Sequence, residues 1–123
     1  MTGARRLFFV AGLYGLVVIL PQFFLEARLG RDYPPAITHP EYFYGFLGVA
    51  AAWQVAFLII ASDPRRYRLL IIPSALEKLS FSAVAAILYW LGRTSPMLLG
   101  FGIVDLAFAL LFIMAFVRLG RYT

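Results

Sequence analysis

Apolar residues fill four long stretches of the chain, and short polar segments that contain proline separate these stretches. Apolar runs of about 18 residues or more without a charged residue are typical of transmembrane helices. The runs from Leu7 to Leu25 and from Tyr42 to Ser62 are of this kind. The pattern predicts four helices, at about residues 6–27, 40–62, 66–92 and 96–118.

The second of these helices has sequence signals at both ends. Thr38, followed by Pro40 and Glu41, is typical of a helix start with a threonine cap, an early proline and a glutamate three residues after the threonine. At the other end Asp63 precedes Pro64, and a proline constrains the residue before it away from helical geometry. We therefore expect this helix to end near residue 62.

Prolines also mark the other helices and connections. Pro21 predicts a bend near the end of the first helix, and the sequence Thr94-Ser95-Pro96 predicts the cap of the fourth. The segment 28–39 is too polar to lie in lipid, so it predicts a connection. Because the connections are short, neighbouring helices should be antiparallel. The expected fold is all-α, a four-transmembrane-helix bundle that forms one domain over residues 1–123.

Composition agrees with an integral membrane protein. Hydrophobic residues make up 63% of the chain and charged residues only 14%, whereas about one quarter of the residues in globular domains are charged. The net charge of +5 comes from arginines at the ends of the apolar segments, which fits membrane topology better than a nucleic-acid partner. The chain has no cysteine, so disulfides, thiol catalysis and cysteine metal sites are excluded.

The distribution of basic residues predicts the orientation of the helices. A signal peptide would explain Arg5 and Arg6 before the first apolar run, but no Ala-x-Ala-like site follows, so we expect that helix to be retained. Cytoplasmic loops of membrane proteins carry an excess of lysine and arginine, which favours cytoplasmic termini here. With that orientation, seven arginines are inside and three are outside. The inner set is Arg5, Arg6, Arg65, Arg66, Arg68, Arg118 and Arg121, and the outer set is Arg28, Arg31 and Arg93.

Four polar side chains are expected near the centre of the bilayer. Gln54 lies in the middle of the second helix, Glu77 and Lys78 in the third, and Asp105 in the fourth. A charge at the bilayer centre costs about 3 kcal/mol on insertion scales, so such residues usually face the bundle interior and pair with one another. Polar residues at this depth either belong to a functional site or act as structural locks that fix the register of the helices. The sequence leaves both interpretations open.

Helical spacing predicts which of these side chains meet. Small and polar residues form one stripe on the third helix and a comparable stripe on the fourth, and small residues allow helices to approach closely in lipid. We therefore expect Lys78 to pair with Asp105, while Glu77 points about 100° away, toward Gln54 or a neighbouring subunit. The stripes are Ser74, Lys78, Ser82, Ala85 and Tyr89 on the third helix, and Gly102, Asp105 and Ala109 on the fourth.

A second polar group is expected at the outer side. Gln22 and Glu26 are four residues apart on the first helix and share a face. His39 and Glu41 begin the second helix at about the same level, so these four residues could line an outer mouth. One histidine and no ligand spacing on a single face argue against a metal site. Catalytic and phosphate-binding motifs are absent, and no cofactor is expected.

Four segments together resemble a group of small, functionally uncharacterised bacterial inner-membrane proteins. They are HPEYFYGFLGVAAAWQ, SDPRRYR, LEKLSF and GFGIVDLAFALLF. The group is similar in layout to the broad DoxX-like set of four-helix membrane proteins, some of which are associated with quinone-linked oxidation or act as accessory subunits. The resemblance implies a four-helix fold and a bacterial inner-membrane location, and it implies no particular activity.

Three functions are compatible with these features. The first is binding of a small amphipathic or lipidic ligand, such as a lipid, quinone or sterol-like molecule, at the central polar cluster. The second is a structural or accessory role as a homo-oligomer or a subunit of a larger membrane complex, with the charges as packing locks. The third is a proton or ion pathway through Glu26, Glu77, Lys78 and Asp105. An enzyme acting on a lipid is less favoured, because no catalytic motif is present.

Overall fold

The computed structural model describes residues 3–120, which are helical and contain no strand. Four helical spans are long and apolar enough to cross a membrane, as the sequence predicts. The elements are α1 (Gly3–Ile19), η1 (Leu20–Phe24), α2 (Glu26–Asp32), α3 (Pro40–Ser62), η2 (Arg68–Leu70), α4 (Ile71–Trp90) and α5 (Pro96–Gly120). Arg121, one of the basic residues expected inside, lies outside the described residues.

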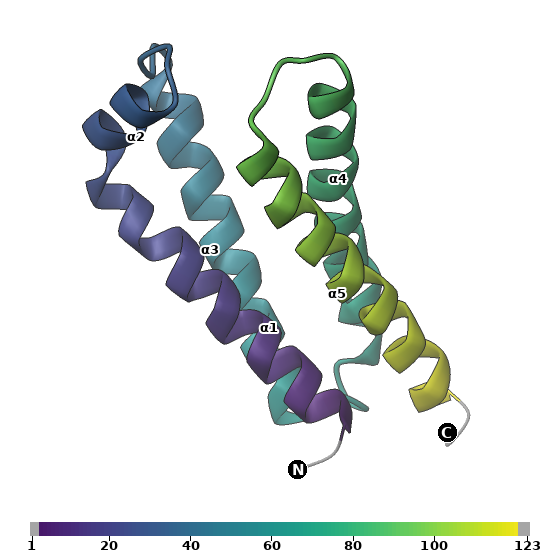
Figure 1. Ribbon diagram of the computed structural model, residues 1–123. Helices are drawn as coiled ribbons and strands as arrows, with labels where there is room; N and C mark the ends of the chain where they lie inside the picture. Colours follow the sequence, from purple (N-terminus) through teal and green to yellow (C-terminus); the bar gives the residue numbers. More distant parts are fainter. Residues whose placement is uncertain (1–2, 121–123) are drawn as a thin grey trace.

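The four long helices run antiparallel to their neighbours in sequence (Figure 1). The start of α1, the α3–α4 connection and the end of α5 lie at one end of the bundle, which we call the N/C end. The short helix α2 and the α4–α5 connection lie at the other, which we call the α2 end. Many large apolar side chains on the outer surface are exposed, as is expected for helices that face lipid.

The boundaries of α3 agree with the prediction, but the predicted threonine cap is wrong. The helix spans Pro40–Ser62, with proline in its first turn. Its N-cap is His39, one residue later than Thr38, and no side chain caps the helix. The side chain of Glu41 instead lies 3.1 Å from the imidazole of His39, so it does not complete a capping box.

The first predicted helix is shorter than expected, because the chain tightens near Pro21. The α-helix ends at Ile19 and continues as the 3-10 segment η1, with proline in its first turn. The following connection contains a short helix, α2, that the apolar pattern did not predict. The ion pair between Arg28 and Asp32, at 3.6 Å and four residues apart, is compatible with a short polar helix. Such a helix buries no residue, so it leaves no apolar periodicity in the sequence.

The last two long helices begin close to the predicted positions. A 3-10 turn, η2, precedes α4, which starts at Ile71 rather than near residue 66. The hydroxyl of Ser95 accepts a hydrogen bond from the backbone N–H of Leu98 at 3.3 Å, which is the predicted cap of α5. Arg68 donates a hydrogen bond to the backbone oxygen of Phe116 at 2.9 Å and lies over its ring, which fastens η2 to α5.

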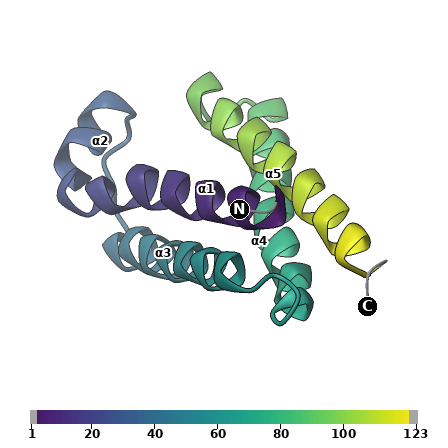
Figure 2. The ribbon, with the colours of Figure 1, turned by 90° about the horizontal axis from the view of Figure 1, so that it is seen from below.

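The helices form two close pairs. Helix α1 packs along α3 and α4 packs along α5, whereas contacts between the pairs are sparse (Figure 2). Glycines allow the close approach within each pair. A Cβ atom at Gly12 would lie 2.8 Å from a methyl carbon of Leu58, and one at Gly102 would lie 2.7 Å from the Cβ of Ala85.

The two pairs join in the half of the bundle toward the N/C end. Phe112 of α5 stacks on Phe8 of α1, with 4.3 Å between ring centroids, and meets the ring of Phe57 of α3 edge-on at 5.1 Å. All three rings are fully buried in one apolar cluster that also includes Ile71 and Ala75 of α4. We call this the packed half. Toward the α2 end, the buried cluster of Ile19, Leu47 and Ala50 joins only α1 to α3.

Candidate functional site

A cleft of about 540 Å³ lies between the two helix pairs, toward the α2 end. It exists because the apolar cluster that joins all four long helices is confined to the packed half. We call the region around it the cleft half. All four polar residues expected at the bilayer centre line this cleft, and they come from three helices: Gln54, Glu77, Lys78 and Asp105.

The predicted pair between α4 and α5 is confirmed. The Nζ atom of Lys78 lies 3.3 Å from Oδ1 of Asp105 and donates a hydrogen bond to it. The side chains are 3% and 13% exposed, so the pair is shielded. The ammonium group also lies 5.3 Å from the ring centroid of Phe57 and 5.5 Å from that of Phe108. A carboxylate and two aromatic faces therefore surround this buried cation.

Glu77 lines the same cleft and has no comparable partner. Its Oε2 atom is buried and makes no hydrogen bond. The carboxyl group is close enough to Lys78 and Asp105 to interact electrostatically with both. Because Lys78 is already bonded to Asp105, the three ionisable groups leave one acidic group in excess. Glu77 is therefore the carboxyl group of this cluster that has no hydrogen-bonded cation.

Gln54 provides a second buried oxygen without a partner. Its Nε2 group donates to the backbone oxygen of Ala50 at 2.8 Å, whereas Oε1 has no hydrogen bond. The residue is only 1% exposed. Its side chain lies against Gly15 of α1 so closely that a Cβ atom at this glycine would overlap the amide. Because Gly15 has no side chain, it leaves room for the amide of Gln54 beside the cleft.

Aromatic side chains border the cleft where one helix pair faces the other. Phe46 of α3 and Phe81 of α4 have their rings 6.2 Å apart, and Tyr14 of α1 and Phe108 of α5 have theirs 5.6 Å apart. All except Phe108 line the cleft. These contacts bring the two pairs together on both flanks of the cleft, and they surround the polar centre with apolar surface.

One contact joins the two pairs at the α2 end. Tyr33, the residue directly after α2, donates a hydrogen bond from its hydroxyl to the sulfur of Met97 at the start of α5. Both residues line the cleft. This role of Tyr33 is not apparent from the sequence, because the short helix before Tyr33 leaves no apolar pattern.

Only one of the four residues expected at an outer mouth lines the cleft. Gln22 does so, and its amide nitrogen donates to the backbone oxygen of Val18 at 3.0 Å. Glu26, His39 and Glu41 lie outside the lining residues. His39 and Glu41 form an exposed pair with each other. Residues 3–120 contain no cluster of three or more His, Cys, Asp or Glu side chains that could hold a metal ion.

Comparison with family models, with curated proteins and with solved structures gives no significant match to this chain. The resemblance to DoxX-like proteins therefore stays an expectation from the residues. The function has to be argued from the cleft itself.

Proposed function

We propose that this multi-pass membrane protein binds an amphipathic ligand in the cleft, with the head group of the ligand at Glu77 and Gln54. The observation that carries the proposal is that both residues line one cleft and that each has a buried side-chain oxygen without a hydrogen bond. A buried acceptor without a hydrogen bond costs about 1–3 kcal/mol. A ligand that satisfies both acceptors recovers this energy, and its apolar body packs on the aromatic border.

The chemistry of the two free atoms defines the head group. Both are oxygens, so they favour a ligand that donates hydrogen bonds. The acidic group in excess adds a preference for positive charge. We infer a hydroxyl or, more strongly, an ammonium head group on an apolar body. A quinone carries only acceptor oxygens and fits less well, so among the ligands expected from the sequence the sterol-like alcohol is favoured over the quinone.

Lys78 and Asp105 have a different role in this proposal. Their charges satisfy each other, and the rings of Phe57 and Phe108 cover the ammonium group. We propose that this ion pair is a structural lock that holds α4 against α5. In that role it also supports the part of the cleft lining that contains Glu77. An ion pathway has less support, because the buried aromatic cluster of the packed half separates the cleft from the N/C end.

We also propose that the N/C end faces the cytoplasm of a bacterial cell, in the inner membrane. The support is the excess of arginine at that end together with the positive-inside rule. The described arginines there are Arg5, Arg6, Arg65, Arg66, Arg68 and Arg118.

Thermal unfolding of the purified protein in neutral detergent tests the ligand assignment. The probes are a long-chain alkylamine, a long-chain alcohol with the same tail, and ubiquinone. We expect the amine to raise the melting temperature most, the alcohol less, and the quinone least. In Glu77→Gln the amine should bind about tenfold more weakly, because hydrogen bonds to a charged group are stronger than neutral ones by ~1 kcal/mol or more. The alcohol should change by less than about threefold.

The matched control is Glu41→Gln, which removes a carboxylate outside the cleft. It should leave the binding of all three probes unchanged. The proposal is wrong if no probe shifts the wild-type protein, or if Glu41→Gln weakens amine binding as much as Glu77→Gln does. A larger shift with ubiquinone than with the amine would overturn the head-group assignment.

A further inference from the structure

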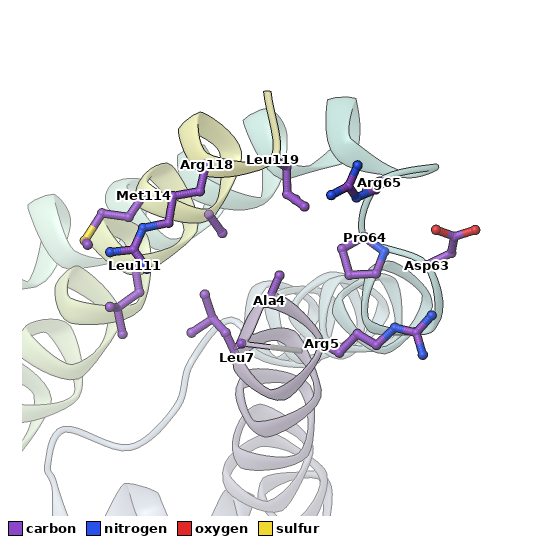
Figure 3. A pocket seen from close by; sticks show the side chains of 12 residues that line it. Ala4, Arg5, Leu7, Asp63, Pro64, Arg65, Leu111, Met114, Arg118 and Leu119 are labelled. Atoms are coloured by element: carbon purple, nitrogen blue, oxygen red, sulfur yellow. The ribbon is translucent and has the colours of Figure 1, made fainter. Parts of the chain in front are cut away.

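A second cavity, of about 490 Å³, lies at the N/C end and is separate from the cleft. The start of α1, the α3–α4 connection and the last turns of α5 line it (Figure 3). It therefore touches both helix pairs. We call it the basic pocket, because three of its lining residues are Arg5, Arg65 and Arg118.

The charge of the basic pocket is strongly unbalanced. Asp63 is the one acidic residue that lines it, against three arginines. In Figure 3 Arg118 lies on the α5 side and Arg65 on the side of the α3–α4 connection, while the side chain of Arg5 extends from α1 toward the side of Asp63. Arg5 and Arg65 also interact with other groups of the protein. A guanidinium group has five N–H donors, so it can keep such a contact and still bind an anion.

The remainder of the basic pocket is apolar. Leu7 lies between the arginines in Figure 3, and Leu111 and Met114 continue the lining along α5. Leu111 and Met114 are 44% and 47% exposed, so this part of the lining merges with the apolar surface that faces lipid. Positive charge therefore lies at the end of the helices, and apolar surface lies directly beside it toward the membrane core.

We propose that the basic pocket binds an anionic phospholipid. The arginines would contact the phosphate of the head group, for which the guanidinium fork is well suited. An acyl chain would lie along Leu111 and Met114. Basic pockets between transmembrane helices bind anionic head groups by this combination of charge and position. Free phosphate has the same charge chemistry, but it would leave the apolar part of the pocket without a partner.

A lipid in this position would connect α1 and the α3–α4 connection to α5. It would thereby strengthen the association of two helix pairs whose direct contacts are sparse. A ligand that binds only the folded protein stabilises it, so occupancy should appear as a higher melting temperature. This expectation does not depend on the ligand proposed for the cleft.

Thermal unfolding in neutral detergent, with native mass spectrometry as a second readout, tests the proposal. The additions are phosphatidylglycerol, phosphatidylcholine and inorganic phosphate. We expect phosphatidylglycerol to raise the melting temperature by several degrees more than the other two, and one such lipid to stay bound in the mass spectrometer. In the Arg5→Gln/Arg65→Gln double variant, phosphatidylglycerol should bind about 25-fold more weakly, from about fivefold for each arginine.

The sequence offers a matched control, because each of these arginines has an arginine beside it that does not line the basic pocket. These neighbours are Arg6 and Arg66, both exposed. The Arg6→Gln/Arg66→Gln double variant carries the same change of net charge and should keep at least most of the lipid effect. If the two double variants lost the same amount of phosphatidylglycerol binding, the lipid would be attracted by the general positive charge of the N/C end. That result would contradict a specific site in the basic pocket. Equal shifts with phosphatidylcholine, or with inorganic phosphate alone, would overturn the assignment to an anionic lipid.

Discussion

The packed half and the cleft half of the bundle differ in what lies between the two helix pairs. In the packed half, the rings of Phe8, Phe57 and Phe112 pack against one another between the two pairs, and the buried residues of that cluster are all apolar. In the cleft half, the same two pairs enclose about 540 Å³, and Oε1 of Gln54 and Oε2 of Glu77 are buried without a hydrogen bond. The packed half therefore accounts for the association of the pairs, and the cleft half carries the unsatisfied chemistry.

The Lys78–Asp105 pair lies where these two regions meet. Its ammonium group contacts rings of the packed half, while both side chains line the cleft. The comparison teaches that a buried charge is not by itself a sign of a binding site. Within one cleft, the charges that satisfy each other hold helices together, and the groups left without a partner are the better candidates for binding.

The largest effect is expected from breaking this pair. Lys78→Met should lower the free energy of unfolding by about 3–5 kcal/mol, because it leaves Asp105 buried without a cation and beside Glu77. Asp105→Leu should cost less, since Glu77 remains within electrostatic reach of Lys78. The Lys78→Met/Asp105→Leu double variant should be more stable than either single variant. Unfolding in detergent, measured as a double-mutant cycle, checks this. Additive losses would show that the two residues are not coupled.

A smaller loss of stability is expected from a substitution in the aromatic cluster of the packed half. Phe112→Ala should lower the free energy of unfolding by about 3 kcal/mol, because it leaves a cavity under two rings in a fully buried cluster. Phe46→Ala is the matched change in the cleft half. Phe46 is 52% exposed, and its substitution should cost less than about 1 kcal/mol. Equal losses at the two positions would contradict the distinction between the halves.

The smallest effect is expected at the α2 end. Tyr33→Phe removes only the hydroxyl that bonds Met97, and it should change the free energy of unfolding by less than about 1 kcal/mol. Its consequence should be local. Backbone amides of α2 should exchange faster with deuterium, while those of the packed half should not change. Unchanged exchange in α2 would show that the Tyr33 contact does not restrain this end of the cleft.

Much of this organisation could be read from the residues. Long apolar stretches, separated by short polar segments that contain proline, predict the four spans, and the spacing of small and polar residues predicts the Lys78–Asp105 contact. The short helix α2 was not predictable in the same way, because it is short and buries no residue. Because α2 was not predicted, the contribution of Tyr33 to the cleft could not be predicted either.

The predicted outer mouth shows more clearly how far the arrangement of side chains can be predicted from the sequence. Gln22, Glu26, His39 and Glu41 lie at similar depths in the sequence, but only Gln22 lines the cleft. Depth follows from the number of residues along a helix, so the sequence contains it. The direction in which a side chain points depends instead on how its helix is rotated about its axis relative to the neighbouring helices. The 3-10 segment at Pro21 changes that rotation before Glu26 is reached.

The sequence by itself determined the four helices, their membrane character and the presence of charge at their centre. These properties follow from hydrophobicity and local geometry along one chain segment at a time. Only the tertiary structure decided that α1 pairs with α3 and α4 with α5, that the pairs separate toward the α2 end, and that Oε2 of Glu77 and Oε1 of Gln54 are buried without a hydrogen bond. Those properties depend on which side chains fill the space between helices, and that depends on all four long helices at once.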